Sequence, residues 1–422
     1  MNIAIIGNNC LADTLSQRFH QENNVKKIYT YDLPEKSFKS DKIQNSQISV
    51  YDPDFQTIKD FWMKKLHQIQ NYKLDLIIAT NLFPQLWKTF FNKLEETGIP
   101  LFIPNPEIAW LEWSKTKSKR LFVDLKIPTS DFEILSYQEI FKNFKKFSRP
   151  YVLKYDQDYR EGLQTIIINN ENVDEEYENF KRHGHLKIKK ELSVDDNILF
   201  VKEKFIKGKE YSYHVICNGK DCRFIGAARD YKKRFENDLG FNTGGMGAYS
   251  PVSYINHSVL DYAKKILNYF INIGIEYKGI MYLGIIVDEN ENHRLLEVNT
   301  RFGDPEFISI LPTIKNNLSE VFLEASLGNS IPKIYFNEKK IVSLRLVTEK
   351  YDLNSKVNLT VLDFKNKHDN ISISYGKGYN NLGPVLTTDK NTLKDSAIHL
   401  QEFLENKNLG DYVYRKDIGL YL

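Results

Sequence analysis

The chain has 422 residues, 41% hydrophobic and 13% aromatic, which is enough for several compact domains of the usual ~100–200 residues. Its 58 basic side chains nearly cancel 55 acidic ones, so the net charge of +3 gives no reason to expect a nucleic acid or a membrane surface as partner. With three cysteines and no apolar run near the ~18 residues of a membrane span, we expect neither a disulfide framework nor a transmembrane protein, and the predicted location is the cytoplasm.

The first hundred residues alternate short β-rich runs with helical patterns. Strands are predicted at 2–7, 26–32, 74–80 and 100–104, with helices beginning at Leu11, Phe55 and Pro84. This rhythm is typical of βαβ units, which form a parallel sheet with helices on both faces. We therefore predict an N-terminal α/β domain over residues 1–105, and an α/β (α+β) fold class for the chain.

Residues 106–190 have the pattern of a smaller α+β domain. One long helix is predicted over 110–125, ended by Pro128, and a second over 138–147. Strands are predicted at 151–156 and 164–169, followed by an acidic helix over 172–184.

Strands resume around Leu199, and long β-rich segments lead to a charged motif at residues 295–307, which indicates a further domain over 191–327. After about Leu327 the sequence changes to short polar strands and turns. Residues 328–422 are therefore predicted to form a small β-rich C-terminal domain.

The segment "LLEVNTRFGDPEF", residues 295–307, places charge in what should be a buried strand. Side chains alternate along a strand, so Glu297 and Asn299 share one face, and Arg301 continues the same parity. Two oxygen ligands suit a Mg²⁺ ion that completes its shell with water and phosphate oxygens. The alternative is a half-exposed strand whose glutamate faces water.

A glycine-rich segment, "NTGGMGAYSP", lies upstream at residues 242–251. Gly244, Gly245 and Gly247 would allow backbone N–H groups to converge on an oxyanion, or a ligand to approach closely. Taken alone, the same pattern also fits an ordinary flexible loop.

These two motifs, with "GIMYLGIIVD" between them, resemble glycinamide ribonucleotide synthetase (phosphoribosylamine–glycine ligase) of purine biosynthesis, in the ATP-grasp superfamily. Further segments match in the same order: "WSKTKSKRLFVDLKIPTSDF", "PYVLK", "EKFIKGKEYSY", "RDYKKRFENDLG" and "YRKDIG". The resemblance covers nearly the whole chain. It implies an ATP-grasp fold preceded by a parallel-sheet (pre-ATP-grasp) domain.

The resemblance also implies an ATP site. Lys119 and Lys154 would neutralise ATP phosphates, Glu203 with the following "KFI" would form the hinge that contacts adenine, and Glu210 would lie by the ribose. Gly244 and Gly245 would belong to the same nucleotide site. For Lys119, a solvated helix lysine is the alternative.

Glu297 and Asn299 match the metal ligands of the family, so ATP with Mg²⁺ (or Mn²⁺) is expected. The family reaction implies that glycine forms an acyl phosphate, which the amine of phosphoribosylamine then attacks. Positioning and charge neutralisation would be the main contributions of the protein. The candidate catalytic residues are Arg301, Asp304, Lys232 and Asp230.

Several positions depart from the family pattern. The family sequence Gly-Asn-Gly-Gly-Arg-Glu-His is "GNNCLAD" here, with Leu11 at the arginine position and Asp13 at the histidine position. Leu82 replaces a glutamate, and Pro384 replaces an arginine. A carboxylate near a substrate phosphate would be unfavourable, so we expect a changed amine site and weak stimulation by phosphoribosylamine.

The glycine-rich loop after Lys154 is also shortened, with Gly162 left as a hinge and Arg160 as a possible substitute for a lysine. Three interpretations therefore stay open: a genuine synthetase, a related ligase that joins another carboxylate to another amine, and a non-catalytic nucleotide-binding relative. The expected partners are small molecules (ATP, a carboxylate such as glycine and an amine such as phosphoribosylamine), with no nucleic acid and no membrane, and the expected assembly is a monomer or homodimer.

Overall fold

The computed structural model describes residues 1–31, 33–46, 66, 69, 71–80, 84–156, 165–181, 199–253, 257–349, 364, 370–376 and 382–420. The chain divides into two compact units. The first comprises Met1–Ala109, Tyr211–Leu283 and Asn299–Leu422, and the second comprises Trp110–Glu210 and Gly284–Val298. None of the described helices is long and apolar enough to cross a membrane.

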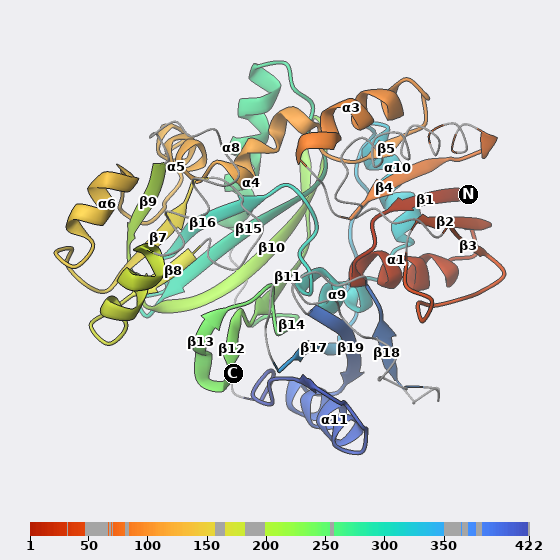
Figure 1. The fold of residues 1–422 in the computed structure, drawn as a ribbon. Coiled ribbons are helices and arrows are strands. Elements are labelled where there is room, and N and C mark those ends of the chain that lie inside the picture. The colour runs from red at the N-terminus through yellow and green to blue at the C-terminus, as the bar shows by residue number, and fades with distance from the viewer. Residues whose placement is uncertain are drawn as a thin grey trace. The chain divides into compact units, whose positions relative to one another are not determined.

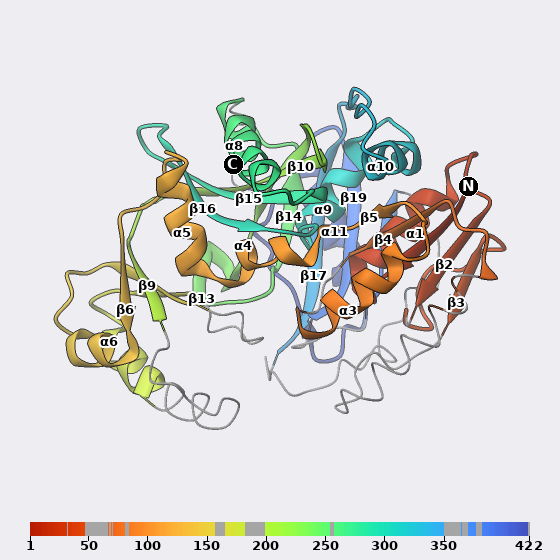
Figure 2. The ribbon, with the colours of Figure 1, turned by 90° about the horizontal axis from the view of Figure 1, so that it is seen from above.

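The first unit begins with a five-stranded sheet in the order β3-β2-β1-β4-β5 (Figure 1). Every neighbouring pair is parallel, which confirms the predicted sheet. Its strands are β1 (Asn2–Ile6), β2 (Lys27–Tyr31), β3 (Ile43–Ser46), β4 (Leu76–Ala79) and β5 (Leu101–Phe102). The strand β3, which lies beside β2 in Figures 1 and 2, was not predicted because its sequence "IQNS" is too polar to show an apolar pattern.

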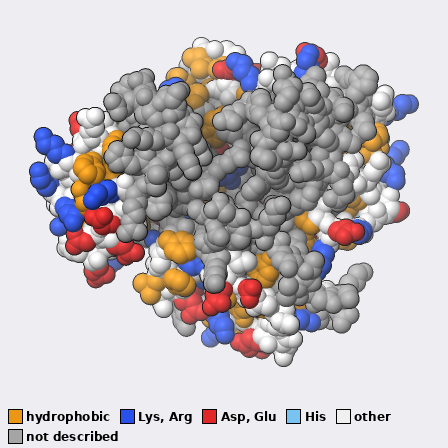
Figure 3. Space-filling view, in the orientation of Figure 1, with side chains coloured by type: hydrophobic (Ala, Val, Ile, Leu, Met, Phe, Trp, Pro, Cys, Tyr) orange, Lys and Arg blue, Asp and Glu red, His pale blue; other side chains and the backbone are white. Residues whose placement is uncertain are grey.

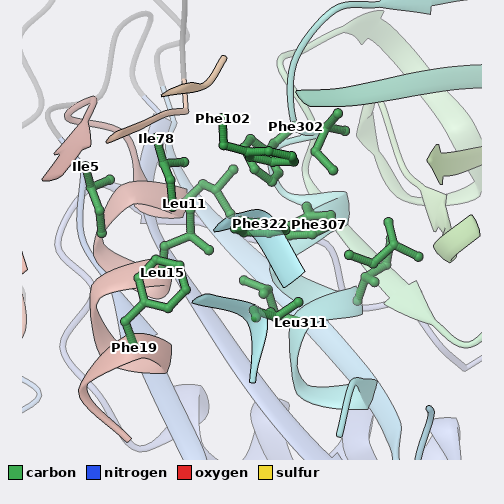
Figure 4. Packing of buried hydrophobic residues seen from close by; sticks show 14 of the residues in the cluster. Ile5, Leu11, Leu15, Phe19, Ile78, Phe102, Phe302, Phe307, Leu311 and Phe322 are labelled. Carbon is green, nitrogen blue, oxygen red and sulfur yellow. The ribbon is translucent and has the colours of Figure 1, made fainter. Parts of the chain in front are cut away.

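Helices pack on both faces of this sheet, because alternate residues of each strand point to opposite sides. On one face, Ile5 and Ile78 pack with α1 (Cys10–His20), whose Leu11 and Leu15 point inward (Figure 4). On the other face, strand residues pack with α3 (Pro84–Glu95). The predicted helix from Phe55 lies outside the described residues.

A large sheet, mainly antiparallel, continues the first unit. Its strands follow the order β15-β10-β11-β14-β17-β19-β18, with β20 also beside β17. They are β10 (Gly208–Asn218), β11 (Cys222–Asp230), β14 (Gly247–Ser250), β15 (Lys278–Asp288), β17 (Lys340–Thr348), β18 (Ile371–Ser374), β19 (Leu382–Lys390) and β20 (Tyr412–Val413). Both β10 and β15 have their other ends in the second unit.

Three helices pack with this sheet: α8 (Ser258–Asn272), α9 (Glu306–Ile310) and α11 (Leu393–Glu405). Helix α10 (Leu318–Ser326) packs instead with β5 of the parallel sheet, where the ring of Phe322 stacks on that of Phe102. Short 3-10 turns lie at η1 (Pro106–Ile108), η2 (Glu236–Asp238) and η3 (Leu311–Thr313). Helix α8 was not predicted among the β-rich segments, although its apolar residues recur with helical spacing.

The residues after Leu327 form longer strands than predicted, and they also include α11. Since β17 pairs with β14, these residues lie in the same compact unit as the N-terminal sheet. The compact units therefore do not correspond one to one with the four predicted domains, and that division stays a prediction.

The second unit has an antiparallel sheet in the order β6-β9-β7-β8. Its strands are β6 (Phe132–Ser136), β7 (Tyr151–Tyr155), β8 (Thr165–Ile168) and β9 (Leu199–Lys204). Helix α6 (Tyr137–Asn143) and a helix over 173–181 accompany the sheet, and aromatic residues such as Phe144, Tyr151 and Phe180 form the core. The unit also includes most of β16 (His293–Asn299).

The predicted long helix over 110–125 is in fact two helices, α4 (Trp110–Trp113) and α5 (Lys115–Asp124). Ser114 separates them with extended backbone angles, φ −98° and ψ 96°, and its side chain accepts a hydrogen bond from the Lys117 N–H. Serine is a strong N-cap residue, so the chain begins a new helix here.

A hairpin of β12 (Lys233–Phe235) and β13 (Leu239–Asn242) extends from the first unit. Its side chains Phe235, Leu239 and Phe241 are exposed. Figure 3 shows hydrophobic side chains gathered on the surface over β12 and β13.

Candidate active site

Two buried lysines and a buried glutamate meet in the second unit, and we call them the lysine cluster. The Lys154 Nζ lies 2.8 Å from the Glu203 Oε1, and the Lys119 Nζ lies 3.1 Å from the same oxygen. Lys154 lies on β7, Lys119 on α5 and Glu203 on β9. The side chain of Lys119 is only 2% exposed. The alternative of a solvated helix lysine at Lys119 is therefore wrong.

Hydroxyl groups complete the lysine cluster. The Lys119 ammonium donates to the Thr129 Oγ1 (2.6 Å) and to the Ser130 Oγ (3.1 Å). Ser130 donates in turn to the Glu203 Oε2 at 2.6 Å, and Thr129 donates to the Leu295 carbonyl at 2.7 Å. The last bond ties the cluster to β16, the strand that carries Glu297.

The lysine cluster carries an excess of positive charge, because two ammonium groups share one carboxylate. Burial, and to a smaller extent the neighbouring Lys154, lowers the pKa of Lys119 to about 8 against the attraction of Glu203. Burial alone would raise the pKa of Glu203, but Lys154 and Lys119 outweigh it and hold that pKa at about 2. Burial would also lower the pKa of Lys154, yet Glu203, Glu297 and Glu210 together raise it. Lys119, whose charged form is the less stabilised of the two, is therefore suited to a bound anion such as phosphate.

The N-terminus of α5 is fixed by Asp156, which follows β7. Its carboxylate accepts from the Thr116 N–H (2.6 Å), the Thr116 hydroxyl (2.7 Å) and the Ser114 hydroxyl (3.1 Å). A carboxylate at a helix N-terminus satisfies free N–H groups and complements the helix dipole. These bonds orient the helix that carries Lys119 against the strand that carries Lys154.

Glu297 and Asn299 lie two residues apart on β16, as predicted. Glu297 is partly exposed, and its Oε2 lies 3.6 Å from the Lys115 Nζ, whereas Asn299 is buried. No group of three or more acidic, histidine or cysteine side chains suited to a metal occurs among the described residues. One carboxylate and one amide oxygen fit a hard cation that takes its other ligands from water and phosphate, rather than a closed protein cage.

The remaining nucleotide-site candidate of the second unit, Glu210, is exposed on β10. Glu203 differs from the prediction in one respect: its side chain is engaged with the two lysines and Ser130, so any adenine contact would fall to the residues that follow it.

A second group of candidates meets in the first unit, where β16 ends. The strand stops at Asn299, so Arg301 lies in the following turn and not on the strand face that its parity predicted. Asp304 of this turn forms an ion pair with Arg345 of β17. The Arg345 Nη1 also donates to the carbonyls of Gly244 (3.1 Å) and Gly245 (3.3 Å).

The turn is further held by His214 and by two phenylalanines. The Gly303 N–H donates to the His214 Nε2 at 3.1 Å. Burial and then the charge of Arg301 lower the pKa of His214 to about 3, so the ring is neutral and can accept this bond. Phe302 and Phe307, whose ring centroids lie 4.8 Å apart, anchor the two ends of the turn in the core (Figure 4).

Asp230 ends β11, and a Cβ on Gly245 would lie 3.3 Å from its Oδ1. Gly245 has φ +101°, a conformation that favours glycine. The backbone carbonyl of Lys232 accepts from both the N–H (2.7 Å) and the hydroxyl (2.9 Å) of Thr243. The structure thus brings Asp230, Gly244, Gly245 and Asp304 together, with the backbone of Lys232 next to them in the chain.

Three of the positions that depart from the family pattern, Leu11, Asp13 and Pro384, are buried in the first unit. Leu11 is buried in the core, and Asp13 accepts from the N–H groups of Phe38 (3.0 Å) and Tyr375 (2.8 Å). Pro384 is buried in β19. The Asp13 carboxylate is thus held by backbone groups of two other segments, and the like-charge penalty expected at this position stays a prediction. Leu82, Arg160 and Gly162 lie outside the described residues.

Sequence patterns missed several residues around these sites. Thr129 and Ser130 belong to "KIPTS", which indicated only the end of a helix, and Asp156 had no motif. Arg345 was detectable as a single charge within the apolar run "IVSLRLV".

Comparisons with a family model and with known relatives indicate the same family. Residues 113–307 match the family described as phosphoribosylglycinamide synthetase, ATP-grasp (A) domain. A phosphoribosylamine–glycine ligase of Leptospira interrogans is 30% identical over 82% of this chain and 83% of its own length. One from Caldanaerobacter subterraneus is 27% identical over 99% of both chains.

Among solved structures, a phosphoribosylamine–glycine ligase of Thermotoga maritima superposes with a TM-score of 0.74. The match covers 99% of this chain and 100% of the other, at 22% identity. This likeness confirms the predicted fold.

Proposed function

Because this chain belongs to the phosphoribosylamine–glycine ligase family, we propose that it is an ATP-dependent, ADP-forming ligase that joins glycine to phosphoribosylamine through a C–N bond. The observation that carries this proposal is the lysine cluster, a buried group with excess positive charge inside the segment that matches the ATP-grasp domain. Such a group has little use in a purely structural core, where an uncompensated charge is costly.

In this proposal, the ammonium groups of Lys119 and Lys154 bind ATP phosphates, and Glu203 acts as their positioning residue. The carboxylate holds both lysines within 3.1 Å, so their charges are in place before the nucleotide arrives. Fixed charges of this kind stabilise a phosphoryl group in transfer without reorganisation during the reaction.

Glu297 and Asn299 would hold a Mg²⁺ or Mn²⁺ ion. When bound, such an ion neutralises charge that develops on the phosphates. The Lys115 ammonium, 3.6 Å from Glu297, balances that carboxylate in the structure, and it would then become available to the phosphates.

The reaction would proceed in two steps. A carboxylate oxygen of glycine attacks the γ-phosphorus of ATP, the bond from that phosphorus to the β-γ bridging oxygen breaks, and ADP leaves. The amine nitrogen of phosphoribosylamine then attacks the acyl carbon of glycyl phosphate, inorganic phosphate leaves, and the nitrogen loses a proton. No covalent bond to the protein is needed.

The first-unit candidates would orient the substrates. Arg301 offers a guanidinium that can bind the carboxylate of glycine, with Asp304, Asp230 and Lys232 as further polar groups near the glycine-rich loop. We also propose that the protein is cytoplasmic, has only small-molecule substrates, and is a monomer or homodimer, which sedimentation analysis would measure.

The test is ADP release with ATP, glycine and enzymatically generated phosphoribosylamine, and with each component omitted in turn. We expect ADP only when glycine is present, and full turnover only with both substrates. ADP formation with other amino acids or amines, but not with this pair, would favour a ligase of different specificity. An absence of turnover with any pair, despite ATP binding, would favour a non-catalytic relative.

A further inference from the structure

Arg345 is a buried charged residue in the middle of an apolar strand. Its neighbours Leu344 and Leu346 on β17 are fully buried, and Arg345 itself is 2% exposed. Burying a guanidinium is costly unless its donors find partners. The partners of this side chain therefore indicate what it does.

The guanidinium of Arg345 joins two separate loops of the first unit. One is the turn after β16, where Asp304 provides its carboxylate and, at 3.5 Å, its carbonyl. The other is the glycine-rich loop, where the carbonyls of Gly244 and Gly245 accept from the Nη1. The Nε, in contrast, has no hydrogen-bond partner among the described residues.

The two loops pack so closely at Gly245 that there is no room for a side chain between them. A Cβ on Gly245 would lie 2.6 Å from the Cδ of Pro305, so a side chain at this position would collide with the turn. Four of the candidate site residues lie in these loops: Gly244, Gly245, Arg301 and Asp304. A group that fixes one loop against the other therefore also fixes these residues.

From these contacts we infer that Arg345 is a positioning residue, which sets the turn of Arg301 and Asp304 against the glycine-rich loop. It does so with donors that lie in one plane and reach a carboxylate and two carbonyls together. A lysine at this position has a single ammonium and cannot present the same fork. The effect on turnover rests on the proposed function, but the coupling of the two loops does not.

The turn after β16 has other contacts, so it should still fold when Arg345 no longer positions it. The Gly303 N–H is bound to His214, and Phe302 and Phe307 lie in the core. We therefore expect Arg345→Lys to fold, while the two loops lose their fixed spacing. Arg345 is not expected to touch ATP, which the second-unit lysines bind in our proposal.

The experiment compares Arg345→Lys with Arg18→Lys. Arg18 is a matched control because it also donates to two carbonyls, those of Ile314 (3.1 Å) and Asn316 (2.7 Å), and to a carboxylate, Glu22. Its partners include no candidate site residue. Turnover, ATP affinity by calorimetry and amide hydrogen exchange would be measured for both variants.

For Arg345→Lys we expect kcat to fall about 10- to 100-fold with little change in ATP affinity, since small misplacements of reacting groups cost rates of this order. Amides of residues 243–246 and 301–304 should exchange faster together. For Arg18→Lys, kcat and the exchange rates of these amides should stay within about twofold of the wild-type values. Unchanged kcat in an active enzyme, or faster exchange in only one of the two loops, would overturn the inference.

A second variant keeps the test independent of activity and of the folding of Arg345→Lys. Asp304→Asn weakens the ion pair to Arg345, so exchange should accelerate in residues 243–246, the loop that Arg345 also binds. Unchanged protection there would overturn the coupling. If the wild-type protein has no ligase activity, the proposed function fails, and the exchange data still decide whether Arg345 couples the loops.

Discussion

Burial makes the charge of Lys119 the one in the lysine cluster that is most sensitive to an arriving anion. Its pKa is lowered to about 8, so at pH 8–9 a large part of this ammonium has lost its proton in the free protein. The lowered pKa also means that protonated Lys119 opposes folding, a cost that is relieved as pH rises from about 8 towards the ordinary value of 10.5.

Bound phosphate would favour the charged form of Lys119 and raise its pKa. We therefore expect ATP binding at pH 8–9 to take up a fraction of a proton, and to take up much less at pH 6.5. Calorimetry in two buffers of different ionisation enthalpy measures this uptake. The Lys119→Met variant should take up almost no proton when ATP binds. Proton uptake equal to that of the wild type would show that Lys119 is not the group that gains the proton.

Lys154 should contribute mainly to ATP affinity. Lys154→Met keeps the apolar stem and leaves Glu203 paired with Lys119, so the fold should persist. Hydrogen bonds to charged groups contribute about 1.5–3 kcal/mol, which corresponds to a loss of about 10- to 100-fold in ATP affinity. Lys202→Met on the same sheet is a matched control, because Lys202 pairs with the exposed Glu133. Equal affinities in the two variants would show that Lys154 does not bind ATP.

Glu297 provides the test of the proposed metal site. Glu297→Gln keeps the size of the side chain but removes the charge that would bind the cation. We expect a large loss of turnover at low Mg²⁺, with partial recovery as Mg²⁺ is raised, because a weakened site fills at higher concentration. Full ADP formation by the variant at low Mg²⁺ would exclude Glu297 as a metal ligand.

At the scale of elements, α1 is connected to two other segments through Asp13. Burial raises the pKa of this carboxyl to about 7, although the N–H groups of Tyr375 and Phe38 oppose the shift. Between pH 4 and 7 the folded state therefore binds more protons than the unfolded state, and the contribution of Asp13 to stability falls as pH rises through this window.

We expect the Asp13→Asn variant to lose this pH dependence. Relative to wild type, its Tm should be lower near pH 5, where the wild-type acid is protonated, and should compare more favourably near pH 8. Thermal unfolding of both proteins across pH 5–8 measures the difference. Parallel pH curves for the two proteins would contradict the assignment of the raised pKa to Asp13.

The elements show which structural features sequence patterns could predict. Strands such as β1 and β4 are short apolar runs between turn residues, so their positions were predictable. The division of α4 from α5 depends on one serine whose capping bond looks, in sequence, like any polar position of a helix. The strand β3 is defined by its pairing with β2, and pairing has no local signal.

The same limit applies to the candidate site. Motif order indicated Lys119, Lys154, Glu297 and Asn299, because these residues lie in recognisable segments. It could not indicate that Glu203 holds both lysines, since that contact depends on how β7, β9 and α5 pack together. Nor could it indicate Arg345, which is about a hundred residues from the loop that it contacts.

At the scale of the whole molecule, the family and the site support one account. The chain matches phosphoribosylamine–glycine ligases over most of its length, and its ATP-grasp segment contains the lysine cluster. The departures at Leu11 and Asp13 have structural explanations within the N-terminal unit. The changed amine site that they predicted stays a prediction.

The most direct test of the account follows an oxygen atom. With glycine labelled with ¹⁸O in its carboxylate, together with ATP and phosphoribosylamine, the attacking oxygen should remain on the phosphate when the amine displaces it. We predict one labelled oxygen in the inorganic phosphate for each glycine joined, measured by mass spectrometry, and equal amounts of ADP and glycinamide ribonucleotide. Phosphate without label, released while the product forms, would contradict the acyl-phosphate ligase that we propose.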